Sequence, residues 1–229
     1  MGHLLLQGGA EFKGRMAASD CAALSRCGGL DAPVFIIPTA AVPDNNHQRA
    51  GGNGERWFRS LGAHRIMVLD LIDRRAANDP AIAAQLQPRS LIYLLGGFPG
   101  FLAQTLAGSA VWSAIREALA QGAVLAGSSA GAMVLCDLFY DPAQAHIAAG
   151  LGVLPNACVL PHHDTFGRQW VSHLRPRLPQ ATLIGIDEET GIIGNLEENE
   201  WMVYGRGTVT LYRPDGTRAR FGDGMVLNL

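Results

Sequence analysis

Short apolar runs alternate with stretches of helical periodicity along the first two thirds of the chain. The runs contain few polar residues and end at Gly or Pro, as expected for strands buried on both faces. The expected strands are His3–Leu6, Val34–Ile37, Arg65–Leu69, Leu91–Leu95 and Ala123–Ala126. The expected helices are Met16–Cys27, Asn53–Leu61, a short helix opened by Asp79 and Pro80, and Val111–Gln121. This β-α-β order predicts an α/β fold with a mostly parallel sheet and helices on both faces.

The last third of the chain has a different pattern. Short apolar runs are separated there by Gly, Asn and Asp, which favour turns. We expect antiparallel strands at one side of the sheet, near the C-terminus, formed by Thr182–Ile186, Gly191–Gly194, Glu200–Tyr204 and Thr208–Tyr212. Neither an internal repeat nor a low-complexity linker interrupts the chain, so residues 1–229 are expected to form one domain.

The segment Gly127–Gly131 carries the clearest chemical signal. It reads G-x-S-x-G, follows an apolar run and leads into a helical stretch, which is the pattern of a nucleophile elbow. A serine at such a turn exposes its hydroxyl beyond the end of the sheet. Ser129 is the central residue of the motif and is therefore the candidate nucleophile. The pattern is weak alone in a chain with 28 glycines, where it also describes a turn without chemistry.

A serine nucleophile needs a base and an acid that orients the base. His162 and His163 follow the strand-like run Cys158–Pro161, so they lie where a loop leaves the sheet. Chemistry collects at that end of the strands in open α/β sheets. The acid stays open between several loop carboxylates, each of which could equally be a turn or cap residue; the candidates are Asp137, Asp141, Asp164, Glu188 and Glu189. Asp141 followed by Pro142 would also suit the start of a helix.

A glycine pair at Gly96-Gly97 ends another expected strand. Glycine lets the backbone approach a ligand closely, so the Gly97 amide could form an oxyanion hole together with the Ala130 amide. A plain turn is the alternative explanation. No His or Cys spacing suits a metal, and we expect neither a metal nor another cofactor.

Composition and charge exclude several classes of protein. The chain is 48% hydrophobic and 17% charged, with a net charge of −2 and Lys13 as its one lysine, which argues against nucleic-acid and membrane-surface binding. The N-terminal segment has no secretory signal pattern, and no apolar run is long enough to span a membrane. The four cysteines form no C-x-x-C pair and are expected to be buried thiols. These features predict a cytoplasmic protein.

Several segments together are similar to a known family. The chain resembles the serine hydrolases that include dipeptidase E and cyanophycinase, whose fold resembles that of class I glutamine amidotransferases, and it is nearer to cyanophycinase. The resemblance rests on Gly8-Gly9, Arg75–Pro80, Leu95–Gly97, Gly127–Met133, Gly150–Gly152, Pro161-His162 and Gly185–Thr190. Class I amidotransferases use cysteine at the elbow, so Ser129 disfavours ammonia transfer.

The resemblance implies roles for individual residues. It makes Ser129 the nucleophile and His162 the general base, and it places the Gly97 and Ala130 amides at the oxyanion hole. The family's acid lies between the serine and the histidine, nearer the histidine. That placement favours Asp141 over Asp137, and it demotes Asp164 and Glu188.

The chain departs from the family around the expected substrate. Leu160-Pro161 precedes the histidine, Phe98-Pro99 follows the glycine pair, and Arg168 remains as the nearby arginine after the histidine. We expect Phe98, His163 and Arg168 to contact the substrate. The pocket is expected to be more apolar, with Phe98, Phe101 and Phe166 as candidate lining residues.

Together these observations predict a serine-type hydrolase of a small peptide or isopeptide. The alternative is a catalytically inactive family member that binds a metabolite. The resemblance and the C-terminal β region favour a homodimer.

Overall fold

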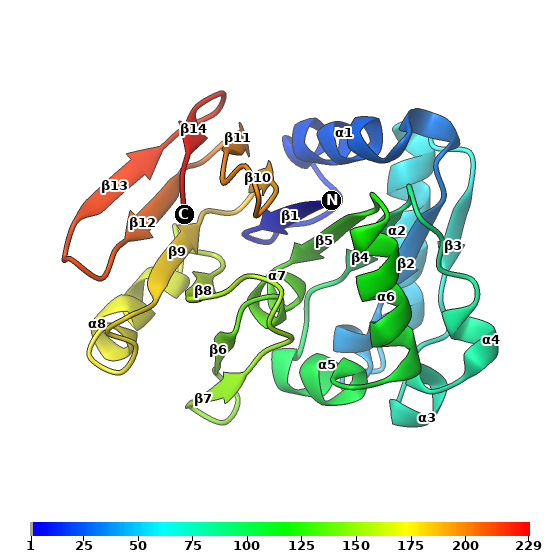
Figure 1. The fold of residues 1–229 in the computed structure, drawn as a ribbon, viewed down its shortest axis with the longest axis horizontal. Coiled ribbons are helices and arrows are strands. Elements are labelled where there is room, and N and C mark those ends of the chain that lie inside the picture. Colours follow the sequence, from blue (N-terminus) through cyan, green and yellow to red (C-terminus); the bar gives the residue numbers. More distant parts are fainter. Residues whose placement is uncertain (1) are drawn as a thin grey trace.

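A computed structural model describes residues 2–229 as an α/β fold around a central eight-stranded sheet (Figure 1). The strand order is β14-β11-β10-β1-β5-β4-β2-β3. Strands β1, β5, β4, β2 and β3 are all parallel to one another. Their bounds are β1 (His3–Gln7), β2 (Val34–Ile37), β3 (Ile66–Val68), β4 (Leu91–Leu94) and β5 (Val124–Ser128). The expected mostly parallel sheet is therefore confirmed, with strand limits within two residues of those expected.

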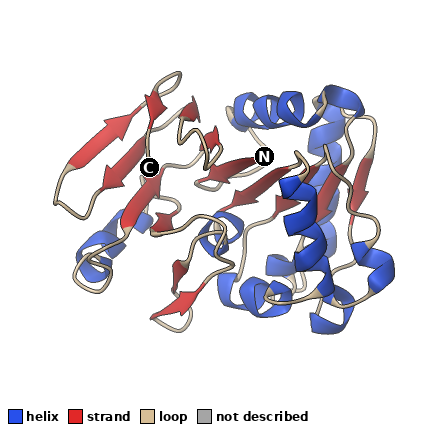
Figure 2. Ribbon diagram, in the orientation of Figure 1, coloured by secondary structure: helices blue, strands red, loops and turns tan. Residues whose placement is uncertain are grey.

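Helices cover both faces of this sheet (Figure 2). Leu24 of α1 and Phe58 of α2 pack in one apolar cluster with Ile36 and Tyr93, whereas α5, α6 and α7 contribute to a second cluster on the opposite face. The helices are α1 (Met16–Cys27), α2 (His47–Ser60), α3 (Arg74–Ala77), α4 (Pro80–Ala83), α5 (Pro99–Leu106), α6 (Ala110–Ala120), α7 (Ala130–Val134) and α8 (Trp170–Leu174). Asp79 caps α4 through the Ala81 amide, as its sequence predicts.

The last third of the chain is divided between two sheets. β10 (Thr190–Gly194), β11 (Trp201–Gly205) and β14 (Val226–Leu227) extend the central sheet beyond β1 through successive antiparallel pairs, β10 with β1, β11 with β10 and β14 with β11. β8 (Ala157–Leu160), β9 (Thr182–Ile186), β12 (Val209–Tyr212) and β13 (Arg218–Phe221) form a separate four-stranded sheet. The expectation of one antiparallel extension is thus corrected, because the local pattern defines a strand but not the edge with which it pairs. β8 and β9 are parallel to each other.

Asp141 does not begin a helix. It ends β6 (Leu138–Asp141), which forms a hairpin with β7 (His146–Ala149). Its Oδ1 accepts a hydrogen bond from the Ala143 amide at 2.9 Å, the short side-chain-to-backbone contact by which aspartate favours turns.

Two further expectations concern the burial of the cysteine thiols and the absence of a membrane-spanning segment. Cys27, Cys136 and Cys158 are buried thiols, but Cys21 is exposed on α1, so the expectation of four buried thiols is wrong for that residue. Within residues 2–229, no helix combines the length and the hydropathy needed to cross a bilayer.

The parallel strands place their following loops at one edge of the sheet. Gln7 of β1 pairs with Ser128 of β5, and Leu94 of β4 pairs with Gly127, so all three strands end at the same level. The Ser129 amide also donates a hydrogen bond to the Gln7 carbonyl at 3.0 Å. The glycine pairs after β1 and β4 therefore meet the elbow after β5, where chemistry is expected in such sheets.

Candidate active site

Ser129 occupies the sharp turn between β5 and α7. Its backbone lies at φ 49° and ψ −112°, a conformation that costs a non-glycine residue about 1–3 kcal/mol and that the expected elbow requires. The flanking glycines permit the turn, because a Cβ on Gly127 would lie 2.4 Å from the Gly131 carbonyl carbon and one on Gly131 would lie 2.2 Å from the Leu94 oxygen. Both substitutions would force β5, α7 and β4 apart.

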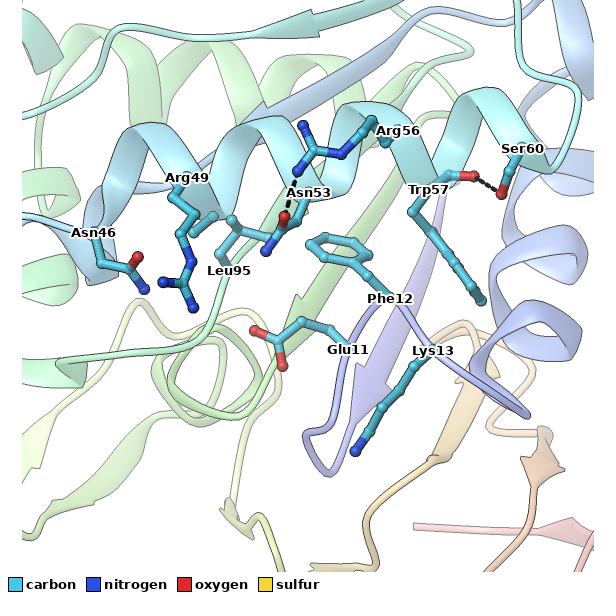
Figure 3. Close-up of a pocket in the computed structure, with 11 residues that line it drawn as sticks. Glu11, Phe12, Lys13, Asn46, Arg49, Asn53, Arg56, Trp57, Ser60 and Leu95 are labelled. Atoms are coloured by element: carbon cyan, nitrogen blue, oxygen red, sulfur yellow. Dashed lines mark hydrogen bonds between the residues drawn. The ribbon is translucent and has the colours of Figure 1, made fainter.

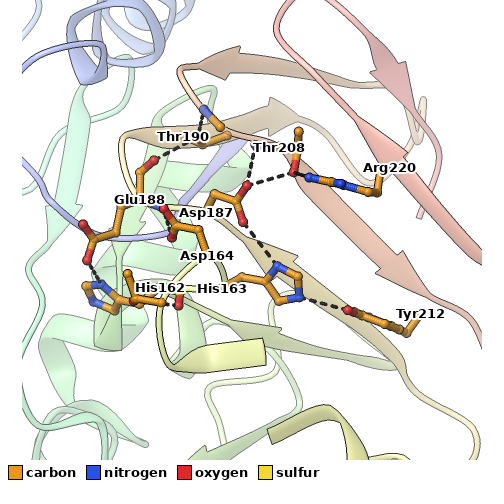
Figure 4. Close-up of polar contacts among 11 residues, drawn as sticks. His162, His163, Asp164, Asp187, Glu188, Thr190, Thr208, Tyr212 and Arg220 are labelled. Atoms are coloured by element: carbon orange, nitrogen blue, oxygen red, sulfur yellow. Dashed lines mark hydrogen bonds and ion pairs between the residues drawn. The ribbon is translucent and has the colours of Figure 1, made fainter. Parts of the chain in front are cut away.

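A continuous chain of contacts links Ser129 to a histidine and a carboxylate. Ser129 Oγ lies 3.0 Å from His162 Nε2, and His162 Nδ1 lies 2.8 Å from Glu188 Oε1 (Figure 4 shows the His162–Glu188 contact). An ionised carboxylate can only accept, so the proton of neutral His162 belongs on Nδ1 and Nε2 is left to accept from the serine. This is the arrangement of a serine nucleophile, its base and an orienting acid.

Glu188, and not Asp141, contacts the candidate base, which corrects the acid expected from the sequence. Asp141 lies in the β6–β7 hairpin with its carboxylate turned to the Ala143 amide. Asp137 accepts from the Asn156 amide at 2.8 Å. Asp164 accepts from the Glu188 amide at 2.9 Å, so it holds the backbone of the acid in place.

The sheet register explains why Glu188 reaches His162. β8 and β9 are parallel, with Leu160 opposite Gly185. Residues just beyond the two strand ends must therefore lie side by side, which brings His162 to Glu188. The available signal was the position of Glu188 immediately after an expected strand. The parallel pairing of β8 with β9 is not visible in the local sequence, whereas the resemblance implies an acid between the serine and the histidine.

The Gly8-Gly9 loop positions both the backbone and the ring of His162. The Gly8 carbonyl accepts the His162 amide at 2.6 Å, and the Gly9 carbonyl accepts the Glu189 amide at 3.2 Å. Gly9 has φ +117°, and a Cβ added there would lie 2.3 Å from Cε1 and 2.6 Å from Nε2 of His162. The absence of a side chain at Gly9 thus leaves the space that the imidazole fills.

Replacement of Gly9 by alanine is expected to slow reaction at Ser129 by about 10²-fold, because the new methyl group displaces the imidazole by roughly 1 Å. The measurement is the rate of covalent labelling by a fluorophosphonate. Gly122→Ala is the matched control, since Gly122 also has positive φ (+97°) but no atom within 4 Å of its Cβ position. Both variants should lose stability, but equal labelling rates in the two would contradict the steric role of Gly9.

The candidate oxyanion hole is formed by backbone. Ala130 is the first residue of α7, and Gly97 has φ +138° in the loop after β4. Within residues 2–229, neither the Gly97 nor the Ala130 amide is engaged in a backbone hydrogen bond outside the regular elements. Phe98 is half-buried, and its amide donates to the Ala40 carbonyl. The assignment of Gly97, Ala130 and Phe98 to substrate contacts stays a prediction.

His163 and Arg168 lie away from the nucleophile. The His163 side chain is buried, with Nδ1 3.2 Å from Asp187 Oδ1 and Nε2 3.0 Å from the Tyr212 hydroxyl (Figure 4). Burial opposes ionisation of Asp187, but hydrogen bonds from His163 and Thr208 outweigh it and lower the pKa of this carboxyl. Arg168 lines a cavity together with His163 and Asp187 rather than with Ser129. The structure thus gives no support to direct substrate contact by His163.

The groove next to the elbow is charged rather than apolar (Figure 3). Its volume is about 570 Å³, and its lining residues are Glu11, Phe12, Lys13, Asn46, Arg49, Ala50, Asn53, Arg56, Trp57, Ser60 and Leu95. Glu11 connects it to the site, because its carboxylate accepts from the Gly96 amide at 3.2 Å and from the Ser128 hydroxyl at 3.1 Å. Phe98, Phe101 and Phe166 do not line this groove, and their contact with substrate stays a prediction; Phe166 stacks on the His162 ring at 4.8 Å.

A buried polar network lies beneath this groove. Asp20 is fully buried and accepts hydrogen bonds from Gln7 Nε2 at 2.8 Å and Trp57 Nε1 at 2.7 Å. Burial without a cationic partner raises the pKa of its carboxyl to about 7. The side-chain oxygen of Gln7 also accepts a hydrogen bond from the Tyr93 hydroxyl, and the backbone carbonyl of Gln7 accepts one from the Ser129 amide. Asp20 therefore supports the strand end that carries the nucleophile.

Asp20 should make the protein lose stability as pH rises toward neutrality. The pKa of Asp20 is higher in the folded than in the unfolded state, so its contribution is complete below about pH 4 and is lost as pH rises through about 7. The loss is up to about 4 kcal/mol. Urea unfolding of the wild type and of Asp20→Asn between these pH values tests this. Parallel pH profiles for the two proteins would contradict it.

Comparison with known proteins identifies the family of this chain. The family model described as peptidase family S51 matches residues 4–202. The chain belongs to peptidase family S51. Two curated S51-like relatives are cyanophycinases: that of Trichormus variabilis is 30% identical over 92% of this chain and 73% of its own length, and that of Synechococcus elongatus is 29% identical over 93% and 68%.

Solved structures show the same architecture. A peptidase from an acI-B1 Actinobacterium is 27% identical, with a TM-score of 0.87 over 100% of this chain and 97% of the other. A putative peptidase E protein from Listeria monocytogenes is 20% identical, with a TM-score of 0.65 over 90% of this chain and 100% of the other, and this likeness concerns the fold. The resemblance expected from the sequence is confirmed at the level of the S51 family and its fold. Within residues 2–229, no cluster of His, Cys, Asp and Glu suits a metal ion.

Proposed function

We propose that this S51 protein is a serine-type peptidase or amide hydrolase that cleaves a small peptide or isopeptide through an acyl-enzyme on Ser129. The observation that carries the proposal is the continuous line from Ser129 Oγ through His162 to Glu188, with contacts of 3.0 and 2.8 Å. Membership of S51 and the similarity to cyanophycinases support the same class of reaction.

In the first half of the reaction, His162 Nε2 accepts the Ser129 hydroxyl proton as Oγ attacks the carbonyl carbon. The carbonyl π electrons move to oxygen, and the amides of Gly97 and Ala130 donate hydrogen bonds to the resulting oxyanion. The intermediate collapses as the C–N bond breaks and His162 gives the proton to the leaving nitrogen. Glu188 stabilises the imidazolium in between and fixes its orientation.

In the second half, water attacks the ester carbon of the acyl-enzyme. His162 accepts the water proton, the same two amides hold the second oxyanion, and the proton returns to Ser129 Oγ as the C–O bond breaks. The products are a carboxylate and an amine, and the enzyme is regenerated. Phe166, stacked on the imidazole, limits its rotation through both halves.

An inactive, metabolite-binding protein is the alternative class. Such a protein does not need a serine, a histidine and a carboxylate within hydrogen-bond distance of one another. Here the Ser129–His162 and His162–Glu188 distances both lie within the range expected for general base catalysis. The geometry therefore favours hydrolysis.

A panel of dipeptides and β-aspartyl peptides tests the proposal. Wild-type protein should release free amine from at least one member, and the Ser129→Ala protein should release none. Absence of cleavage, together with tight binding of an intact panel member by both proteins, would favour the binding alternative. A homodimer remains a prediction.

A further inference from the structure

A second cavity adjoins the segment that follows His162 in the chain. Its volume is about 380 Å³, within the range of small-molecule sites, and it lies between residues 163–168 and the hairpin formed by β12 and β13. The lining residues are His163, Asp164, Thr165, Arg168, Asp187, Thr210, Arg218 and Arg220. Neither Ser129 nor His162 contributes, so this cavity is distinct from the candidate active site.

Three arginines, Arg168, Arg218 and Arg220, line this cavity without an ion-paired carboxylate. Arg218 lies over the Tyr212 ring at 5.4 Å, and Arg220 Nη2 donates to Thr208 Oγ1 at 3.0 Å. Among residues 2–229, none of Arg168, Arg218 and Arg220 has a carboxylate oxygen within 4.0 Å. Strand register places two of them together, because Thr210 pairs with Arg220 and Tyr212 with Arg218 on neighbouring strands. These four side chains therefore share one face of the hairpin.

The two carboxylates of the cavity are already engaged. Asp187 Oδ1 faces His163, and Oδ2 accepts from both the amide and the hydroxyl of Thr208 at 2.8 Å (Figure 4). Asp164 Oδ1 accepts from the Glu188 amide. Neither carboxylate forms an ion pair with Arg168, Arg218 or Arg220, so the guanidinium N–H groups remain available to an anion, and the three arginines outnumber the two carboxylates of the cavity.

Thr210 supplies a second, independent observation. Its side chain is 1% exposed, and its hydroxyl lacks a hydrogen-bond partner within the described part of the chain. Leaving a buried hydroxyl unpaired costs about 1–3 kcal/mol, so such a group indicates a missing partner. Thr210 is one of the residues that line the cavity, and it pairs with Arg220 on the neighbouring strand, which places its hydroxyl close to where an anion would bind.

We propose that this cavity binds a small oxyanion, either phosphate or the carboxylate of a small metabolite, through Arg168, Arg218, Arg220 and the Thr210 hydroxyl. Guanidinium groups present planar pairs of donors that match carboxylate and phosphate oxygens. Because the binding residues exclude the nucleophile, binding requires no turnover and is independent of the proposed hydrolysis.

Isothermal titration of the full chain with inorganic phosphate and, separately, with succinate tests the proposal, at an ionic strength held constant with sodium chloride. At least one of the two anions should bind to the wild type, and the anion that binds identifies the class of oxyanion. The double variant Arg218→Gln/Arg220→Gln should weaken that binding by about tenfold or more, since it removes two charge-assisted contacts. Arg213→Gln is the matched control, because Arg213 lies on the same hairpin but outside the cavity and should leave the affinity unchanged.

Thr210→Val separates a ligand contact from a structural role. It keeps the shape of the side chain and removes a hydroxyl without a partner, so the variant should be at least as stable as the wild type while its anion affinity falls several-fold. A circular dichroism melt checks that each variant is folded. The proposal is overturned if neither anion binds better than chloride, or if the double variant binds as tightly as the wild type.

Discussion

Ser129→Ala is expected to reduce peptide hydrolysis by about 10⁵-fold or more and to abolish covalent labelling by a fluorophosphonate. The reason is that alanine removes the oxygen that attacks the carbonyl while it keeps the elbow, because Ala and Ser tolerate φ 49° equally poorly. Intact mass spectrometry measures the labelled fraction, and peptide mapping locates the adduct. Wild-type protein should carry one adduct, on Ser129.

Ser128→Ala is the matched control for this result. Ser128 is the preceding residue and is buried, with its hydroxyl donating to Glu11 rather than facing His162. Loss of that single hydrogen bond to a carboxylate should slow labelling by no more than about tenfold. Persistent labelling of a folded Ser129→Ala protein, or an adduct mapped to Ser128, would refute the assignment of the nucleophile.

Glu188→Gln is expected to reduce the hydrolytic rate by up to about 10⁴-fold. The amide removes the charge that stabilises the His162 imidazolium, and its NH₂ group can favour the wrong tautomer of the ring. The side chain keeps its size, so the fold should be unaffected. The hydrolytic rate and the rate of fluorophosphonate labelling should fall together, since both depend on His162 as the base.

Asp141→Asn distinguishes Glu188, the proposed acid, from Asp141, the acid that the resemblance implies. Asparagine makes the same short contact to the backbone as aspartate, so the bond to the Ala143 amide persists and the rate should stay within about threefold of the wild type. A large loss of rate in Asp141→Asn, with little change in Glu188→Gln, would reverse the assignment.

The local pattern was sufficient for the elements that carry the nucleophile. Uninterrupted apolar runs predicted β2, β4 and β5, and the small residues around Ser129 predicted the strained elbow that the structure contains. These features depend on neighbours in the chain. A five-residue turn with glycine on both sides has few conformations that continue a buried strand into a helix, so the position of the Ser129 hydroxyl follows from short-range sterics.

Sequence analysis was therefore sufficient to predict the α/β fold, the elbow at Ser129 and the edge of the sheet at which His162 lies. The carboxylate that contacts His162 depends on tertiary contacts, since parallel pairing of Leu160 with Gly185 brings Glu188 to the ring while Asp141 closes a hairpin. Tertiary packing also places the charged side chains of Glu11, Lys13, Arg49 and Arg56 along one groove, and brings Arg218 and Arg220 of β13 to the same cavity as Arg168. Such contacts join residues distant in the chain, and strand register, which local propensity does not encode, sets them.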